Sequence, residues 1–384
     1  MNDRLLRFAL ASLIAMLGAC SSLDSLNPFS GSPSKTKPAE LTAIITTADL
    51  KTDWQSGIGG SGEYSFTPAV VGTSVYAAAR DGSVARFDDG RQVWRVDAGQ
   101  FLSGGVGSDG KLVVLGTSKG EVLAFDAASG NSVWKTRVNS EVLAAPAVSG
   151  GLVVIRSGDS RIFAFEASDG KRRWVYQRST PALSLRSFAG VAMAGRTVVI
   201  GFPGGKLVAI NAENGAALWE GTVALPKGAT ELERIADVTS LPVIQGREVC
   251  AVAYQGRVTC FDLNKGNHLW SREVSSSTGL DLDAKSVYVS DEKGSVLAFD
   301  RSNGSSLWKQ DKLFMRGLSR PLALGGNIVV ADAQGTVHLL NRDDGSFTAR
   351  FSGDGSAILA DPQRFKDGFV VQTRGGGIFA LSVK

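Results

Sequence analysis

Residues 120–134 read GEVLAFDAASGNSVW, and this pattern returns along the chain: a Gly, a short apolar run, an Asp or Asn, a second Gly and a Trp. The other full copies are SRIFAFEASDGKRRW (160–174), GKLVAINAENGAALW (205–219), GRVTCFDLNKGNHLW (256–270) and GSVLAFDRSNGSSLW (294–308). A shorter copy, GSVARFDDGRQVW, occupies residues 82–94. The intervals between successive Trp residues are 40, 40, 40, 45, 51 and 38. A period near 40 with several short strands per unit is typical of propeller blades rather than of helical solenoids.

Within the repeat at 120–134 each part has a separate role. Residues 122–125 are apolar in succession, so we expect this strand to be covered on both faces. Asp126–Gly130 predicts a turn, because an Asp side chain can accept backbone N–H groups and Gly can adopt a positive φ. Trp134 falls on the next strand, where its size allows it to reach an adjacent blade. Its replacement by Ala is expected to cost about 3–5 kcal/mol.

The same packing role is predicted for all the repeated Trp residues, and the alternative is a row of aromatic ligand platforms. The residues in question are Trp54, Trp94, Trp134, Trp174, Trp219, Trp270 and Trp308. Strand segments such as LVVLGT and TVVIGF precede each turn, and no sustained helical period follows the leader. The predicted class is all-β.

The blade count follows from how the chain ends. Six units end at a Trp, and a seventh, GTVHLLNRDDGSFTA, has Ala349 at the Trp position with Phe347 two residues earlier. The chain then forms two further strand segments and stops without an outer strand, whereas LKTDW at 50–54 reads as an outer strand with no inner strands before it. We therefore predict an eight-bladed β-propeller of four-stranded blades, with the N-terminal strand completing the last blade. Seven blades remain the alternative.

The first nineteen residues read as a lipoprotein signal peptide. Arg4 and Arg7 precede an apolar run that is too short to span a bilayer as a mature helix. The run ends in LGAC, which resembles a bacterial lipobox with Cys20 as the acylated, for example palmitoylated, residue. By analogy with bacterial lipoproteins, the presence of Ser rather than Asp at position 21 implies the periplasmic face of the outer membrane. A plain secretory signal is the alternative.

The predicted domains are the signal peptide (1–19), the lipidated Cys with a flexible tether (20–42) and the propeller (43–384). The tether is rich in Ser, Pro and Lys. A formal net charge of +4 gives no case for nucleic-acid binding, which needs a concentrated basic face. Two His and three Cys leave little material for a metal site.

Two breaks in the rhythm point to a binding surface. The 45- and 51-residue intervals contain VYQRSTPALSLRSFAG (175–190) and EGTVALPKGATELERIADVTS (220–240), which fall between one blade and the next. Insertions on one face of a repeat protein often mark the binding side. Leu183, Leu185 and Arg186 combine apolar side chains with a guanidinium, as interface cores often do. Alternatively, the two Leu residues are inward-facing residues of an inner strand.

Acidic side chains lie in the second of these segments, at Glu231, Glu233 and Asp237. The lipobox, WQSGIGGSG (54–62), the Trp-marked blades, ALSLRS (182–187) and ATELERIADVTSLP (229–242) together resemble the BamB family. These are the propeller lipoproteins of the outer-membrane β-barrel assembly machinery. The resemblance covers essentially the whole chain after the leader. The blade repeat is shared with quinoprotein-type propellers, so the two interblade segments carry most of the specificity.

The resemblance implies a non-enzymatic periplasmic scaffold that assists the folding and insertion of β-barrel proteins. It implies that Leu183, Leu185 and Arg186 contact the POTRA domains of a BamA-like protein. The family's acidic pair reads Asp-Val-Asp, so Asp237 carries over as a partner-binding residue, whereas Thr239 departs from the pattern. Unfolded outer-membrane proteins are a partner class that the sequence leaves open. No cofactor other than the covalent lipid on Cys20 is implied.

Two other functions are alternatives on the sequence alone. The blade repeat also resembles that of pyrroloquinoline-quinone dehydrogenases, which need carboxylates on Ca²⁺ and a general base. Here the candidate polar residues sit at the repeated turn position: Asn211, Asp262, Asp300 and Asn341. His268 and His338 have no evident nucleophile partner, so no catalytic or metal residue is assigned. A general peptide-binding propeller, using strand addition at a sheet edge, is the other alternative.

Cys250 and Cys260 flank a turn at Gln255-Gly256. If that turn has two residues, Cys250 faces Phe261, and the two sulfur atoms point to opposite faces. The expectation is two buried free thiols.

Overall fold

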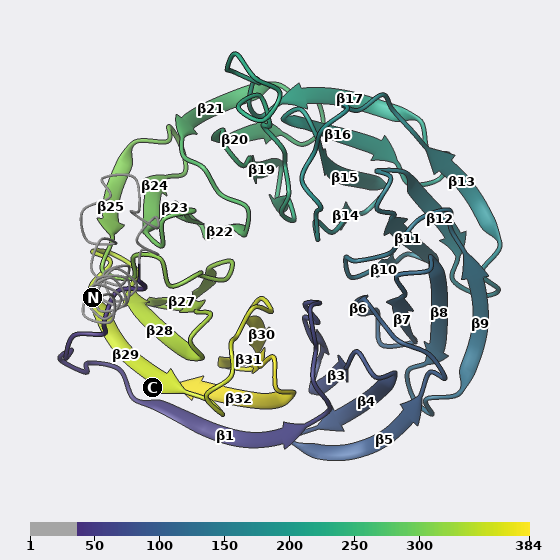
Figure 1. The fold of residues 1–384 in the computed structure, drawn as a ribbon, viewed down its shortest axis with the longest axis horizontal. Helices are drawn as coiled ribbons and strands as arrows, with labels where there is room; N and C mark the ends of the chain where they lie inside the picture. Colours follow the sequence, from purple (N-terminus) through teal and green to yellow (C-terminus); the bar gives the residue numbers. More distant parts are fainter. Residues whose placement is uncertain (1–36) are drawn as a thin grey trace, which may run out of the picture. The chain divides into compact units, whose positions relative to one another are not determined.

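The computed structural model describes residues 37–384, of which Ala39–Lys384 form one compact unit. Its strands form eight separate four-stranded antiparallel sheets, arranged in a ring (Figure 1). The prediction of an eight-bladed all-β propeller is confirmed. Cys20, the signal peptide and most of the tether lie outside the described residues. Within residues 37–384, no helix is long and apolar enough to cross a membrane.

Each blade has four strands, here called a to d from the inside of the ring outwards. Blades 1 to 4 consist of β2 (Ala69–Val71), β3 (Ser74–Ala78), β4 (Ser83–Asp88) and β5 (Arg91–Asp97); β6 (Gly104–Ser108), β7 (Leu112–Gly116), β8 (Glu121–Asp126) and β9 (Ser132–Arg137); β10 (Ala147–Ser149), β11 (Leu152–Arg156), β12 (Ile162–Glu166) and β13 (Arg172–Tyr176); and β14 (Ala192–Ala194), β15 (Thr197–Phe202), β16 (Lys206–Asn211) and β17 (Ala217–Thr222).

Blades 5 to 7 follow the same order, and blade 8 takes its outer strand from the N-terminal part of the chain. They consist of β18 (Val243–Gln245), β19 (Glu248–Val252), β20 (Arg257–Asp262) and β21 (His268–Glu273); β22 (Gly279–Leu282), β23 (Ser286–Ser290), β24 (Val296–Asp300) and β25 (Ser306–Gln310); β26 (Leu322–Leu324), β27 (Asn327–Ala331), β28 (Thr336–Asn341) and β29 (Phe347–Ser352); and β30 (Gln363–Phe365), β31 (Gly368–Gln372), β32 (Gly377–Val383) and β1 (Leu50–Gly57).

The pairing of β1 with β32 closes the ring, as the missing outer strand at the C-terminus predicts. Leu50 pairs with Val383 and Gly57 with Gly377. The segment before β1 also contacts blade 7, where the Thr47 N–H donates to the Thr348 carbonyl at 2.9 Å. Because the two ends of the chain pair in this way, blade 8 has four strands like the others.

The core lies between blades rather than within one sheet. Residues of blade 2, such as Val122 and Trp134, pack directly on residues of blade 3, such as Phe163 and Phe165. Both faces of the middle strands are therefore buried, which explains why they are apolar in succession rather than alternating.

Each of the seven repeated Trp residues contacts the following blade at a Gly in that blade's c–d turn. The indole N–H of Trp134 donates to the Ala167 carbonyl of blade 3 at 2.8 Å. Its ring lies under Gly170, which has a φ of +71°, and a Cβ on that Gly would lie 2.7 Å from the ring. The same stacking joins Trp54 to Gly90, Trp94 to Gly130, Trp174 to Gly215, Trp219 to Gly266, Trp270 to Gly304 and Trp308 to Gly345. The Gly and the Trp of one repeat thus belong to two different blade interfaces.

The seventh repeat lacks a Trp for a reason that the structure makes plain. Blade 8 has no c–d turn, because its strand c ends the chain and its strand d begins the propeller. There is no turn Gly for a Trp on β29 to meet, and Ala349 is buried in its place.

The prediction of two free thiols is wrong, because Cys250 and Cys260 form a disulfide with their Cα atoms 4.1 Å apart. The turn between β19 and β20 has three residues, 254–256, and not two, with Gln255 at a φ of +47°. The extra residue shifts the register by one position, so Cys250 pairs with Cys260 instead of Phe261. Both side chains then point to the same face, where they are fully buried.

Candidate partner-binding site

One face of the ring carries all the connections from strand d of one blade to strand a of the next. We call it the connection face, and it comprises residues 58–68, 98–103, 138–146, 177–191, 223–242, 274–278, 311–321 and 353–362. The turns between strands b and c lie on the same face, as shown by the bond from Val138 N–H to the Gly120 carbonyl at 2.8 Å. The a–b and c–d turns lie on the opposite face.

The two long connections, 177–191 and 223–242, lead into blades 4 and 5. In Figure 1 the longer one forms the loop that projects beyond the ring between β17 and β21. Leu183 and Leu185 lie in the first of them, outside any strand, because strand a of blade 4 begins at Ala192. The interpretation of these two residues as part of an inner strand is therefore wrong.

Asp237, in the second long connection, links the two connections by a hydrogen bond to the backbone of the first. Its carboxylate accepts the N–H of Leu185 at 2.7 Å and the N–H of Gly204 at 2.9 Å. The side chain is 2% exposed, so it faces the protein and not the solvent. Asp237 therefore fixes the backbone of the segment that carries Leu183, Leu185 and Arg186, and any effect it has on a partner is indirect.

Thr239, at the second position of the family's acidic pair, is also buried. Its hydroxyl donates to the Ser277 carbonyl at 3.2 Å, and its own carbonyl accepts the Ser187 hydroxyl at 3.2 Å. In this chain the position links neighbouring connections through neutral hydrogen bonds.

Arg186 is held by a residue that the sequence did not point to. Its guanidinium donates to both carboxylate oxygens of Glu141, at 2.9 and 2.7 Å, and lies 6.0 Å from the ring centre of Tyr64. The bond to Glu141 raises the pKa of Arg186, which stays charged at any accessible pH. The side chain remains 50% exposed. A positive group is thus held in one orientation while part of it faces the solvent.

Apolar side chains gather on the connection face. Among residues 37–384, eight of the exposed large hydrophobic residues lie in these connections: Phe101, Leu183, Phe188, Leu225, Leu232, Phe314, Met315 and Leu359. The others lie in the segment before β1 or on outer strands, and none of those described lies in an a–b or c–d turn. Leu225 and Leu232, at the tip of the second long connection, are 64% and 67% exposed. The two long connections carry four of these eight residues, which makes them the most apolar part of this face.

The acidic residues of the second connection differ in role. The Glu233 carboxylate accepts the N–H groups of Ala229 at 2.9 Å and Thr230 at 3.1 Å, and these bonds lower its pKa. Glu233 therefore shapes the loop itself. Glu231 is exposed and lies 3.8 Å from Arg234.

The residues weighed for catalysis do not converge on one site. Those at the repeated turn position accept N–H groups of their own turns, as in the bonds from Asn264 N–H to Asp262 at 3.1 Å and from Ser302 N–H to Asp300 at 2.9 Å. Asn211 and Asn341 make the same local bond. His268 is exposed at the start of β21 and packs edge-on against Phe261.

His338 belongs to a buried charge cluster that sequence reasoning missed. Its Nε2 and the Arg316 Nε lie 2.8 and 2.6 Å from the same oxygen of Asp332. All three side chains are buried, and Arg316 also donates to the Ala39 carbonyl at 3.0 Å. Burial lowers the pKa of His338, against the opposing effect of Asp332. The cluster secures the segment before β1 on blade 7.

The group of residues that comes nearest to a metal-ligand set within residues 37–384 is Glu248, Cys250 and Cys260. Both sulfur atoms are committed to the disulfide, so they offer no thiolate ligand.

The ring carries two long connections on one face, and Asp237 joins them by a hydrogen bond. They present exposed Leu and Phe side chains and an Arg held in one orientation. These features are typical of a binding protein of the scaffold type. Comparison with known proteins agrees with this class. The family model described as outer membrane protein assembly factor BamB matches residues 45–310. The chain therefore belongs to the BamB family.

Individual relatives match over nearly the whole chain. The protein named outer membrane protein assembly factor BamB of Nitrosomonas eutropha is 45% identical over 394 residues, covering 100% of this chain and 96% of that protein. The crystal structure of BamB from Moraxella catarrhalis superposes with a TM-score of 0.81 at 29% identity, covering 87% of this chain and 100% of that one.

Quinone-dependent enzymes share the fold alone. The quinohemoprotein alcohol dehydrogenase of Comamonas testosteroni superposes with a TM-score of 0.70 at 13% identity, over 87% of this chain and 76% of that one. Family membership thus groups this chain with proteins named as assembly factors and not with the dehydrogenases.

Proposed function

We propose that this protein is a periplasmic scaffold that binds the POTRA domains of a BamA-like barrel-assembly protein through the surface formed by residues 177–191 and 223–242. The observation that carries the proposal is the way Asp237 and Glu141 fix Leu185 and Arg186 on the raised connection face. Because the loop conformation is set before binding, less entropy is lost on association.

Within this surface Leu183 and Arg186 are the accessible anchors. Leu183 is 44% exposed and supplies apolar area for a partner. Leu185 is half-buried, so part of its side chain packs within the loop and the rest is accessible to a partner. Arg186 offers the donors that Glu141 does not use, and a fork of this kind suits an acidic group on the partner.

The remaining parts of the proposal concern location and action. The covalent lipid on Cys20 holds the propeller at the periplasmic face of the outer membrane, and no other cofactor takes part. Bound in this way, the protein places its partner, or the partner's unfolded clients, for insertion of β-barrel proteins. The Cys20→Ser variant is expected to leave the membrane fraction and appear in the soluble periplasmic fraction.

The proposal is tested by measuring the binding of the chain, purified in detergent, to the partner's POTRA domains by calorimetry. Arg186→Glu is expected to weaken binding by at least about 30-fold, the size of effect typical of an interface anchor. The matched control is Arg173→Glu, which breaks a similar two-point pair with Glu166, at 2.8 Å, on an outer strand away from the surface. Equal loss of binding in both variants, or in neither, contradicts the assignment.

A further inference from the structure

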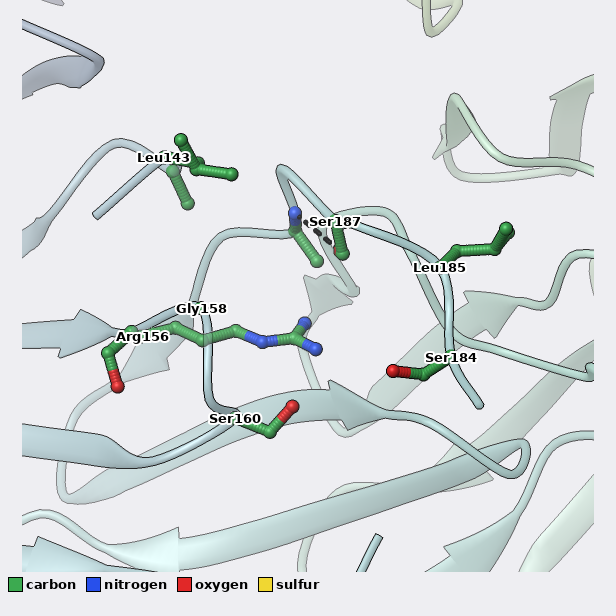
Figure 2. A pocket seen from close by; sticks show the side chains of 10 residues that line it. Leu143, Arg156, Gly158, Ser160, Ser184, Leu185 and Ser187 are labelled. Carbon is green, nitrogen blue, oxygen red and sulfur yellow. Dashed lines mark hydrogen bonds between the residues drawn. The ribbon is translucent and has the colours of Figure 1, made fainter. Parts of the chain in front are cut away.

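A small cavity lies beside the partner-binding surface, between the first long connection and the b–c turn of blade 3. Its volume is about 20 Å³, enough for one water molecule or a single ion. Figure 2 shows the guanidinium of Arg156 extending into the middle of it, with labelled serines around it. The lining residues are Leu143, Ala144, Arg156, Ser157, Gly158, Ser160, Ser184, Leu185, Ser187 and Ala189.

Arg156 is a buried cation whose donors are not all used. The residue is 7% exposed, and its Nη1 has no hydrogen-bond partner among residues 37–384. The guanidinium carbon lies 5.9 Å from the ring centre of Phe202, so an apolar surface covers one side. Burial lowers the pKa of Arg156 to about 10, so the group is still protonated at neutral pH. A buried charge without an acceptor is strongly unfavourable, and such groups normally have a partner.

The acidic groups nearby already bond to other groups, and none of those within residues 37–384 is paired with the Arg156 Nη1. Asp237 attracts Arg156 through space, but its two oxygens already accept the N–H groups of Leu185 and Gly204. On the other sides of the cavity, Asp159 is paired with Arg161 at 3.0 Å, and Glu141 is paired with Arg186.

Two hydroxyl groups add to the surplus of donors. In Figure 2 the side-chain oxygens of Ser160 and Ser184 point toward the guanidinium of Arg156. Ser187 differs, since its hydroxyl donates to the Thr239 carbonyl and accepts the Ala189 N–H. Ser160 is half-buried and Ser184 is exposed, so the two hydroxyls lie at the open side of the cavity. A guanidinium and two hydroxyls around one cavity can together donate to one negatively charged acceptor.

We propose that this cavity binds a small anionic group through Arg156, Ser160 and Ser184. The group is either a dissolved halide ion or a carboxylate oxygen of a bound partner's Asp or Glu side chain. The second source rests on the proposed function, whereas the first does not. In both cases the anion joins Ser184 of the LSLR segment to Arg156 and Ser160 of blade 3.

The halide source is tested on the chain purified in detergent, with bromide as the probe. Crystals grown with bromide as the only halide are expected to show an anomalous peak beside Arg156. Replacing gluconate by bromide at equal ionic strength is expected to raise the melting temperature of the wild type, as any ligand of the native state does. The rise is expected to disappear in Arg156→Gln and to persist in the control Arg161→Gln, whose guanidinium is already paired on the same turn.

The carboxylate source is tested by double-mutant cycles between Arg156→Gln and neutralised acidic residues of the POTRA domains. Coupling of at least about tenfold with one of them supports a partner carboxylate. If the cavity gives no bromide signal and Arg156→Gln binds the partner like the wild type, the cavity holds only water and the inference is wrong. In that case the loss of binding in Arg186→Glu still supports the proposed function. If Arg156→Gln does not fold, the wild-type bromide peak still decides the halide source and Arg156→Lys replaces it in the cycles.

Discussion

The contact between Trp134 and Gly170 offers a direct test of what the repeated motif does. Gly170 has a φ of +71°, and an added Cβ would lie 2.7 Å from the Trp134 ring. Gly170→Ala therefore has two unfavourable terms. An L side chain in the left-handed region costs about 1–2 kcal/mol, and forcing a side chain into a filled space costs about 1–3 kcal/mol more.

Gly195 separates the two terms, because it has a φ of +57° and no atom within 4 Å of an added Cβ. Gly195→Ala is expected to lower the free energy of unfolding by about 1–2 kcal/mol, the backbone term alone. The difference between the two variants then measures the contact with the Trp. In the Trp134→Ala background the space under Gly170 is empty, so Gly170→Ala should cost no more than Gly195→Ala. The expected coupling between positions 134 and 170 is about 1–3 kcal/mol.

The assay is urea unfolding of each single and double variant, followed by Trp fluorescence and by far-ultraviolet circular dichroism, with coincidence of the two probes as the test of two-state behaviour. The reasoning is refuted if Gly170→Ala costs the same as Gly195→Ala in the wild-type background. It is equally refuted if the two substitutions at positions 134 and 170 are additive.

Three further outcomes are expected. In Asp237→Asn one carboxylate oxygen becomes an NH₂ group, which faces a backbone N–H that it cannot accept. The local stability of residues 177–191 should fall by about 1–3 kcal/mol. This segment should then be cut more readily by protease, and POTRA binding should weaken. Removal of the disulfide by the double variant Cys250→Ala, Cys260→Ala should lower the free energy of unfolding by about 2–3 kcal/mol, and alkylation should label the wild-type sulfur atoms only after denaturation and reduction. His338 has a native pKa below its ordinary value of 6.5, so the native state binds fewer protons than the unfolded one and stability falls as the pH falls through 6.5 toward the native pKa. His338→Gln should remove that slope, and an unchanged slope in urea midpoints measured at successive pH values would contradict it.

The propeller could be derived from the sequence because its signal is repeated. The sequence shows a 40-residue period and strand segments rich in Val and Ile. It also has an outer strand without inner strands at its N-terminal end and a blade without an outer strand at its C-terminal end. Together these features predict the blade count and the closure through β1. The disulfide could not be derived in the same way, because it depends on one residue of turn length. A turn of three residues in place of two reverses the face of every side chain on one strand relative to the other.

The candidate site was located by spacing, but its internal organisation was not. Asp237 reads as an exposed acid beside Glu231 and Glu233, whereas the fold turns it inward onto the backbone of Leu185. Glu141 and Tyr64, which hold Arg186, lie 45 and 122 residues away along the chain. Contacts of this range leave no local pattern in the sequence, because they depend on how the connections of separate blades are placed around the ring.

The Gly–Trp pairs and the connection face lie on opposite faces of the ring. Each Trp stacks on the c–d turn of the following blade, on the face opposite the connections, so seven of the eight blade interfaces share this contact. The connection face takes no part in this contact, and its loops can differ in length without disturbing the ring. This explains how that face accommodates the two long connections and the exposed apolar residues that they carry. The proposed binding surface can therefore vary on one face of the propeller, while the contacts that hold the blades together lie on the other.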